Sequence, residues 1–323
     1  MNNRLSNIEL LRCFAVLSLV AWHSICVYVG WTSFLPDISE SIGDTLITKI
    51  YKYASRVLIP SANMPLFTAI SGFVYAYLRT QGKYQDIKDF YKKKVKRLLI
   101  PYFIIGTLVV FTIADWKPIS ILYGDAHHLW YCAMLFWCFV FIRLFEKVPS
   151  FIKILIIVIG IVFNFVTVPF NYNILGLFTG IKYLPFFIIG FYLPSYLSKL
   201  QLGGAKIIIA MIWIICLFLA ELMGGKAFIL LRSLMFVLFL FAIVPTNIKV
   251  GNFVTKISSY SFGIYVFHEW ILWNVAHIDA LHPFIIKHQV LYPLIAFVLT
   301  LSISILLTKY SLKTKVGKFL LAS

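Results

Sequence analysis

Three side chains near the N-terminus have the types and spacing for acid–base chemistry on an anionic substrate. Glu9, Arg12 and His23 lie in one apolar stretch, and the step from Arg12 to His23 is eleven residues. On an α-helix that step is about 1100°, or three turns and roughly 20°, so both side chains share one face about 16 Å apart. A guanidinium can hold phosphate, and an imidazole can act as a general base near neutral pH. Glu9, three residues before Arg12, is placed to pair with it.

Spacing alone leaves a second interpretation of this stretch open. Arg12 can be a helix-end arginine that extends its charge to the membrane surface. His23 can be a structural histidine that bonds to a neighbouring helix. Both interpretations place the two residues on a membrane-spanning helix.

The chain is too apolar for a soluble protein. Of its 323 residues 61% are hydrophobic and 13% are charged, whereas soluble domains are about half apolar and about a quarter charged. Apolar windows of about 19 residues predict ten spans, at 6–30, 57–78, 98–114, 128–145, 151–168, 174–198, 205–223, 227–245, 258–277 and 289–308. We therefore expect an all-α, polytopic transmembrane helical bundle. Residues 1–323 are expected to form one integral-membrane domain with no appended soluble domain.

The basic charge indicates orientation in the membrane. The formal net charge is +17, from 29 Lys and Arg against 12 Asp and Glu. With both termini in the cytoplasm, 21 of the 29 basic residues fall in cytoplasmic segments, as the positive-inside rule requires. Orientation in the membrane therefore accounts for most of the positive charge, and nucleic acid is not expected as a partner. The first apolar run is long and lacks a small-residue cleavage site, so it is predicted to be a retained helix.

A few ionisable side chains fall at membrane depth outside the first span, where each costs several kcal/mol unless it is paired or hydrated. They are Lys182, Arg232, His268 and Glu269. A buried structural network of His268 and Glu269 with Arg232 or Lys182 is one interpretation. A functional role is the other, because such residues are uncommon within spans.

Five blocks of the sequence share their pattern and order with one known family. They are Glu9 to His23, MPLFTAISGF at 64–73, FYKKKVKRLLIPY at 90–102, HLWY at 128–131 and YSFGIYVFH at 260–268. These blocks resemble the R-x(10)-H, P-x-F-x-x-x-S-G-F, R-x-x-R-[IL]-x-x-P, HLWFL and Y-S-x-G-I-Y-L-x-H motifs of the integral-membrane acyltransferase family 3. That family includes O-acetylases of surface polysaccharides, lipopolysaccharide and peptidoglycan. Lys94 departs from the pattern, since it stands where the family usually has an arginine and lacks bidentate geometry for phosphate.

The resemblance implies a multi-pass acyltransferase of the bacterial cytoplasmic membrane. It would move an acyl group, most often acetyl, from cytoplasmic acyl-CoA to a hydroxyl of a cell-surface or lipid-linked carbohydrate. Acyl-CoA is then a co-substrate, and no bound cofactor is expected. His23 would be the catalytic base, and the acyl-CoA phosphates would bind Arg12, Lys94 and Arg97. Glu9 would support this site.

The resemblance also suggests supporting and acceptor-side residues. Ser71 and Gly72 are expected to support the site, chiefly by allowing close helix packing. The residues expected on the acceptor side are His128, Trp130, Tyr265, His268 and Glu269. Interfacial anchoring is an equal alternative for His127 and His128, which lie beside Trp130 in the sequence. No metal site is expected, because the five cysteines lack C-x-x-C spacing and His127 and His128 diverge by about 100° on a helix.

Two other classes of protein also fit ten spans with polar groups inside. A transporter or flippase of a lipid-linked saccharide or an acylated product is the main alternative, although the paired halves with broken helices common in transporters are not evident. A sensor or structural partner in a polysaccharide-synthesis complex is the third, and it would not need cations that face phosphate. Besides the acyl donor and the carbohydrate acceptor, the expected partners are membrane lipids and polysaccharide-synthesis proteins.

Overall fold

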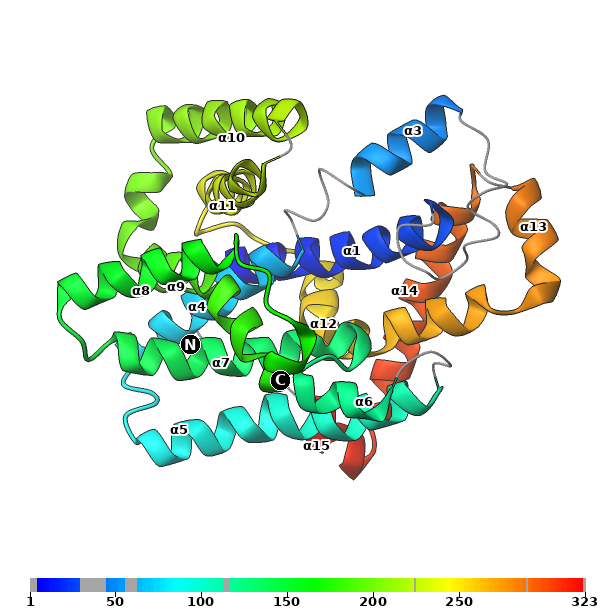
Figure 1. Cartoon of the computed structure of the whole chain (residues 1–323), viewed down its shortest axis with the longest axis horizontal. Helices are drawn as coiled ribbons and strands as arrows, with labels where there is room; N and C mark the ends of the chain where they lie inside the picture. Colours follow the sequence, from blue (N-terminus) through cyan, green and yellow to red (C-terminus); the bar gives the residue numbers. More distant parts are fainter. Residues whose placement is uncertain are drawn as a thin grey trace. The chain divides into compact units, whose positions relative to one another are not determined.

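Every regular element in the described part of the chain is a helix. The computed structural model describes residues 5–29, 45–55, 63–112, 117–223, 225–288 and 290–321 (Figure 1). Over these ranges the contacts divide the helices into two compact units, one made from both ends of the chain and one from its middle. Each unit positions its own set of side chains.

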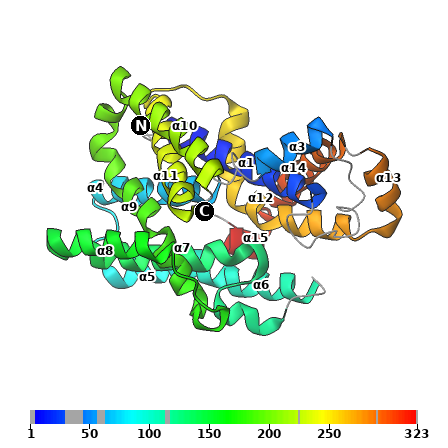
Figure 2. The same ribbon diagram turned by 45° about the horizontal axis from the view of Figure 1, so that its top comes forward.

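The first unit comprises residues Met1–Asn63 and Lys249–Ser323. Its helices are α1 (Ser6–Val29), α3 (Leu46–Tyr53), α12 (Asn252–Ala276), α13 (His282–Lys287), α14 (Tyr292–Ser311) and α15 (Lys315–Leu321). Helix α1 packs along α12 and α14, and the three lie together in both ribbon views (Figures 1 and 2). The approach of α12 to α14 depends on Gly263, where an added Cβ would overlap the side chain of Thr308.

The second unit comprises Met64–Ile248. Its helices are α4 (Met64–Thr80), α5 (Ile87–Lys94), α6 (Ile100–Thr112), α7 (Trp130–Phe145), α8 (Ser150–Phe163), α9 (Leu177–Leu200), α10 (Gly203–Met223) and α11 (Lys226–Ile243). Helices α4 and α9 cross closely, since a Cβ on Gly72 would overlap the backbone oxygen of Phe187 and one on Gly190 that of Ala69. This is the close packing expected at Ser71-Gly72.

A short π-helix, Val95–Leu99, joins α5 to α6. Pro101 has no N–H and cannot bond to the carbonyl of Arg97 four residues back. The N–H of Ile100 instead bonds to the oxygen of Val95, five residues back. The helix is therefore wider at the basic segment before Pro101, a distortion that often occurs at functional sites.

Seven helical stretches of the described residues are long and apolar enough to cross a membrane. They are Ser6–Cys26, Ile87–Thr112, Pro118–Phe145, Ile174–Leu200, Gly203–Met223, Lys226–Ile243 and Tyr292–Ser311. A helix also occupies the other three expected ranges, but α4 has 17 residues, α8 has 14 and α12 carries polar side chains inside its 25 residues. The beginning of the range 57–78 lies outside the described residues.

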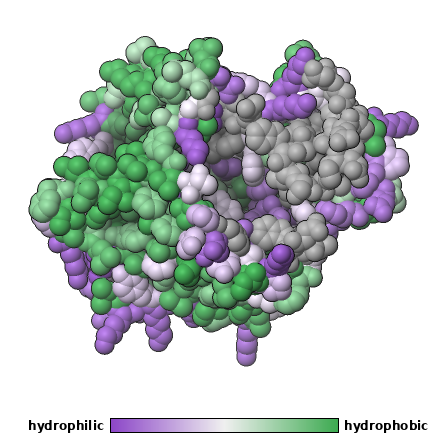
Figure 3. Space-filling model, in the orientation of Figure 1, coloured by the Kyte–Doolittle hydropathy of each residue, from purple (hydrophilic) through white to green (hydrophobic). Residues whose placement is uncertain are grey.

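The outer surfaces of these helices are strongly apolar. Large exposed hydrophobic side chains on α8 and α10 include Phe151, Ile154, Ile208 and Phe218. Figure 3 shows a broad hydrophobic area over these two helices. A surface of this kind suits contact with lipid and would be costly in water.

Candidate active site

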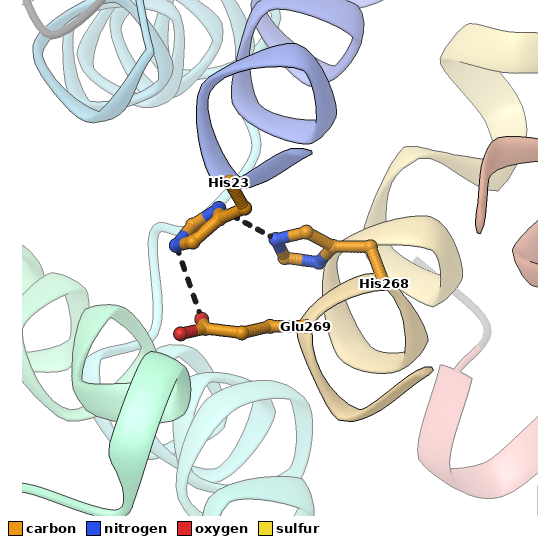
Figure 4. A group of neighbouring side chains, drawn as sticks. All are labelled: His23, His268 and Glu269. Carbon is orange, nitrogen blue, oxygen red and sulfur yellow. Dashed lines mark hydrogen bonds and ion pairs between the residues drawn. The ribbon is translucent and has the colours of Figure 1, made fainter. Parts of the chain in front are cut away.

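Helices α1 and α12 bring two imidazoles and a carboxylate together inside the first unit. Nδ1 of His23 lies 3.1 Å from Nε2 of His268, and Nε2 of His23 lies 3.2 Å from Oε2 of Glu269 (Figure 4). All three residues are buried. His23 is the central member of the row, because it uses one ring nitrogen toward each of the other two side chains.

Backbone carbonyls determine which ring nitrogens carry hydrogen. Nδ1 of His268 lies 2.7 Å from the oxygen of Tyr265, which only accepts, so Nδ1 carries the proton. Nε2 of a neutral His268 then offers a lone pair to His23. Nδ1 of His23 also lies 3.2 Å from the oxygen of Leu19 and therefore faces two acceptors. We infer that Nδ1 of His23 carries hydrogen as well.

With these assignments, one proton remains to be placed between Nε2 of His23 and Oε2 of Glu269. If His23 and Glu269 both lacked that proton, a ring lone pair would face a carboxylate lone pair across 3.2 Å. The proton therefore lies either on Nε2, as an imidazolium–carboxylate pair, or on Oε2, as a neutral pair. Such a pair can accept a proton from a substrate and return it, which is general acid–base chemistry.

Trp22 and the C-terminal end of α3 form a wall beside His23. The indole and imidazole rings meet edge to face, with centroids 4.5 Å apart and an interplanar angle of 76°. Nε1 of Trp22 donates a 2.8 Å hydrogen bond to the oxygen of Ser55. Ser55 lies two residues after the end of α3, and Tyr51 on α3 donates to the oxygen of Val290 at 2.8 Å. Helix α3 therefore holds the indole that restricts the rotation of His23.

The other sequence-predicted residues of α1 lie on the same helix as His23. Helix α1 continues unbroken from Ser6 to Val29, so the predicted axial separation of Arg12 and His23 holds. Arg12 is half-buried. Oε2 of Glu9 accepts a 3.1 Å hydrogen bond from Thr255 on α12, so Glu9 also helps join the two helices that carry the site.

The three buried side chains are close enough to hold a metal ion, since one ligand atom from each of His23, His268 and Glu269 lies within 4.8 Å of the others. One feature favours proton transfer over metal binding. His23 presents different nitrogens to its two neighbours, and a metal ion would need all three donors to converge on one point. The N–H of His268 that bonds to Tyr265 is compatible with both metal binding and proton transfer.

In the second unit, the predicted donor-binding residues differ in exposure. Arg97 is exposed, as a phosphate contact requires. Lys94 is only 7% exposed, and its ammonium lies 3.5 Å from the ring centroid of Phe139, with the rings of Tyr84 and Phe90 at 5.0 and 5.4 Å. These surroundings favour an anchoring role for Lys94 over direct contact with phosphate.

The other residues predicted from the sequence to support the site or to face the acceptor make contacts of their own. Ser71 donates to the oxygen of Phe67 at 2.9 Å, within its own helix. His128 is buried with its Nδ1 3.4 Å from Nδ1 of His127. Trp130 is half-buried and its ring contacts Tyr183. The ring of Tyr265 packs against His268. An acceptor-side role for His128, Trp130 and Tyr265 stays a prediction, as does a supporting role for Ser71.

Sequence reasoning did not identify two groups of residues. Trp22 precedes the predicted base in the sequence, but neighbours on a helix normally point about 100° apart. In the sequence no motif contains Glu146, and Arg79 and Arg143 are two of the 21 basic residues expected in cytoplasmic segments. In the structure Glu146 binds both arginines. The signal in the sequence that could have identified Glu146 is an acidic side chain within a basic and apolar region.

Comparison with known proteins supplies the family. A family model described as an acyltransferase domain, that of acyltransferase family 3, matches residues 5–309. The match covers both units and nearly the whole chain. No curated protein and no solved structure matches the chain.

Proposed function

Because the chain belongs to acyltransferase family 3 and is therefore a multi-pass membrane acyltransferase, we propose that it acylates a carbohydrate hydroxyl with acyl-CoA. The acyl group is most often acetyl in this family. The proposed acceptor is a cell-surface or lipid-linked carbohydrate, and the proposed location is the bacterial cytoplasmic membrane with both termini in the cytoplasm. The observation that carries the proposal is the buried contact of Nε2 of His23 with Oε2 of Glu269.

The proposed reaction needs a group that takes a proton and then returns it. The acceptor oxygen forms a bond to the acyl carbon as the carbon–sulfur bond of the thioester breaks. In the imidazolium–carboxylate form of the pair, the carboxylate of Glu269 accepts the hydroxyl proton, and the pair returns one proton to the departing thiolate, which leaves as free coenzyme A. His268 holds His23 by its ring nitrogen, so His23 remains oriented while the shared proton moves.

The proposed donor is an anion, and two arginines are assigned to it. Arg12 and Arg97 would bind the phosphates of coenzyme A, since guanidinium matches phosphate geometry. The pantetheine arm separates these phosphates from the thioester. An axial distance of about 16 Å between Arg12 and His23 is compatible with phosphates near one end of α1 and the acyl carbon near the other.

The test uses the purified full-length protein in lipid nanodiscs with acetyl-CoA and an extract of membrane glycans. We expect free coenzyme A, measured with a thiol reagent, in the same amount as the acetyl groups that mass spectrometry finds on the glycans. Succinyl-CoA in parallel identifies the preferred acyl group. A transporter or flippase would move its substrate without releasing thiol, so the absence of thiol release and glycan acylation would overturn the proposal.

A further inference from the structure

A second buried polar cluster surrounds Glu146 at the end of α7. Tyr75 donates a 2.9 Å hydrogen bond to Oε1 of Glu146, and Nε of Arg79 donates to the same oxygen at 3.2 Å. Nη1 of Arg143 donates to Oε2 at 2.9 Å. The side chains of Arg143 and Glu146 are 6% and 15% exposed. Both carboxylate oxygens are thus occupied, and this carboxylate has no role in the proposed reaction.

The two arginines also hold the turn between α4 and α5. Nη1 of Arg79 donates to the oxygen of Tyr84 at 3.2 Å, and Nη2 of Arg143 donates to the oxygen of Gln85 at 3.3 Å. Tyr84 has a φ of 63°, a left-handed conformation that is uncommon for residues other than glycine and persists only where surrounding contacts impose it. The Glu146 cluster supplies those contacts.

The held turn leads directly into the basic segment, residues 88–97. Asp86 caps α5 by accepting from the N–H of Asp89 at 2.6 Å. Two turns later the ammonium of Lys94 lies against Phe139 of α7 and near the ring of Tyr84. The segment is therefore attached to α7 at both ends, through Arg143 and Glu146 at its start and through Lys94 near its end.

The backbone between these attachments, and the π-helix that follows the second, carries the charged side chains that face outward. Lys92, Lys93, Lys96 and Arg97 are exposed, and hydrophilic side chains project from the edge of the molecule where α5 lies (Figure 3). The π-helix carries Lys96 and Arg97. Exposed lysines and arginines bind phosphate more tightly when their backbone is already ordered, because less conformational freedom is lost on binding.

We propose that Glu146 is a positioning residue for the acyl donor. Through Arg79 and Arg143, Glu146 holds the basic segment that receives the phosphates. This inference rests on the proposed function. Glu146 does not touch the donor, and Lys94 anchors the segment while Arg97 and the exposed lysines contact phosphate.

The experiment compares two donors with the variant Glu146→Gln. Acetyl-CoA carries the phosphates, and acetyl-pantetheine carries the same thioester without them. We expect KM for acetyl-CoA to rise about tenfold with kcat changed by less than about twofold. The kinetic constants for acetyl-pantetheine should not change. Glu221→Gln is the matched control, because Glu221 is an exposed carboxylate of the same unit, and it should match the wild type with both donors.

The outcomes separate the two proposals. If wild-type protein consumes neither thioester, the proposed function fails. If the wild type is active and Glu146→Gln lowers kcat/KM equally for both donors, or leaves KM for acetyl-CoA unchanged, the positioning role of Glu146 fails. Should Glu146→Gln not fold, Arg79→Lys keeps the charge but removes the Nε–H donor. It should raise KM for acetyl-CoA alone, and an equal effect on both donors would again overturn the inference.

Discussion

Two carboxylates of this chain, one buried and one partly buried, accept from nitrogen donors, and those donors differ in whether they can lose a proton. Glu269 faces the imidazole of His23, whereas Glu146 faces the guanidinium groups of Arg79 and Arg143. Imidazole changes charge near neutral pH. Guanidinium stays charged throughout the range in which proteins are folded.

The same kind of ion pair therefore serves two purposes in one fold. The pair with imidazole can transfer a proton, and its geometry must survive both protonation states. The pairs with guanidinium cannot transfer a proton, so their contribution is fixed geometry. This difference predicts that changes at the first cluster act on kcat and that changes at the second act on donor binding and stability.

The largest expected effect is that of removing the central imidazole. His23→Ala should lower kcat about 10³-fold, within the range that general acid–base groups contribute. Free coenzyme A release measures it. His277→Ala is the control, because His277 is an exposed histidine next to α12. Retention of wild-type turnover by His23→Ala would remove the imidazole from the mechanism.

Removing the proton-accepting oxygen should have the next largest effect. Glu269→Gln should lower kcat about 10²-fold, because an amide cannot take the shared proton. The variation of kcat with pH should also become flatter, since one ionising group is lost. Asp279→Asn, at an exposed position of the same unit, should keep the wild-type profile. A pH profile of unchanged shape in Glu269→Gln would contradict the shared proton.

A smaller effect is expected at the wall beside His23. Trp22→Phe keeps an aromatic ring but loses the N–H that donates to Ser55, so we expect kcat to fall about threefold, the cost of part of one hydrogen bond. Trp213→Phe is the matched control, because Nε1 of Trp213 has no hydrogen-bond partner in the described part of the chain. Equal turnover in the two variants would show that the indole N–H does not orient His23.

The smallest expected effect concerns the guanidinium cluster and pH. Glu146→Gln should lower the thermal midpoint of unfolding, and the difference from wild type should be the same at pH 6 and pH 9, because both arginines remain charged at each pH. Differential scanning fluorimetry in detergent measures it. A difference that changes between the two pH values would indicate that a group of the cluster titrates within this range, and the contrast between the clusters would weaken.

The sequence supports local inferences well, because they depend on one helix at a time. The face shared by Arg12 and His23 follows from helical periodicity, and α1 is continuous through both residues. Apolar windows likewise locate helices. They overstate the number of clear spans, since α8 is short and α12 carries His268 and Glu269.

Contacts between segments that are distant in the chain could not be predicted from the sequence. His23 and His268 are 245 residues apart, and nothing in either motif indicates that α1 packs against α12. Lys94 belongs to a basic run that charge counting treats as solvated. Its burial depends on three aromatic rings, and Phe139, the nearest of them, belongs to α7.

The separation of α1 from α12 also has a consequence for how the protein is made. At about 5–20 residues per second, a ribosome needs roughly 12–50 s to synthesise the 245 residues between His23 and His268. During that interval α1 has been inserted while its partner helix does not yet exist. His23 is costly to leave without partners in a bilayer, so lipid headgroups or the insertion machinery must shelter it until α12 emerges.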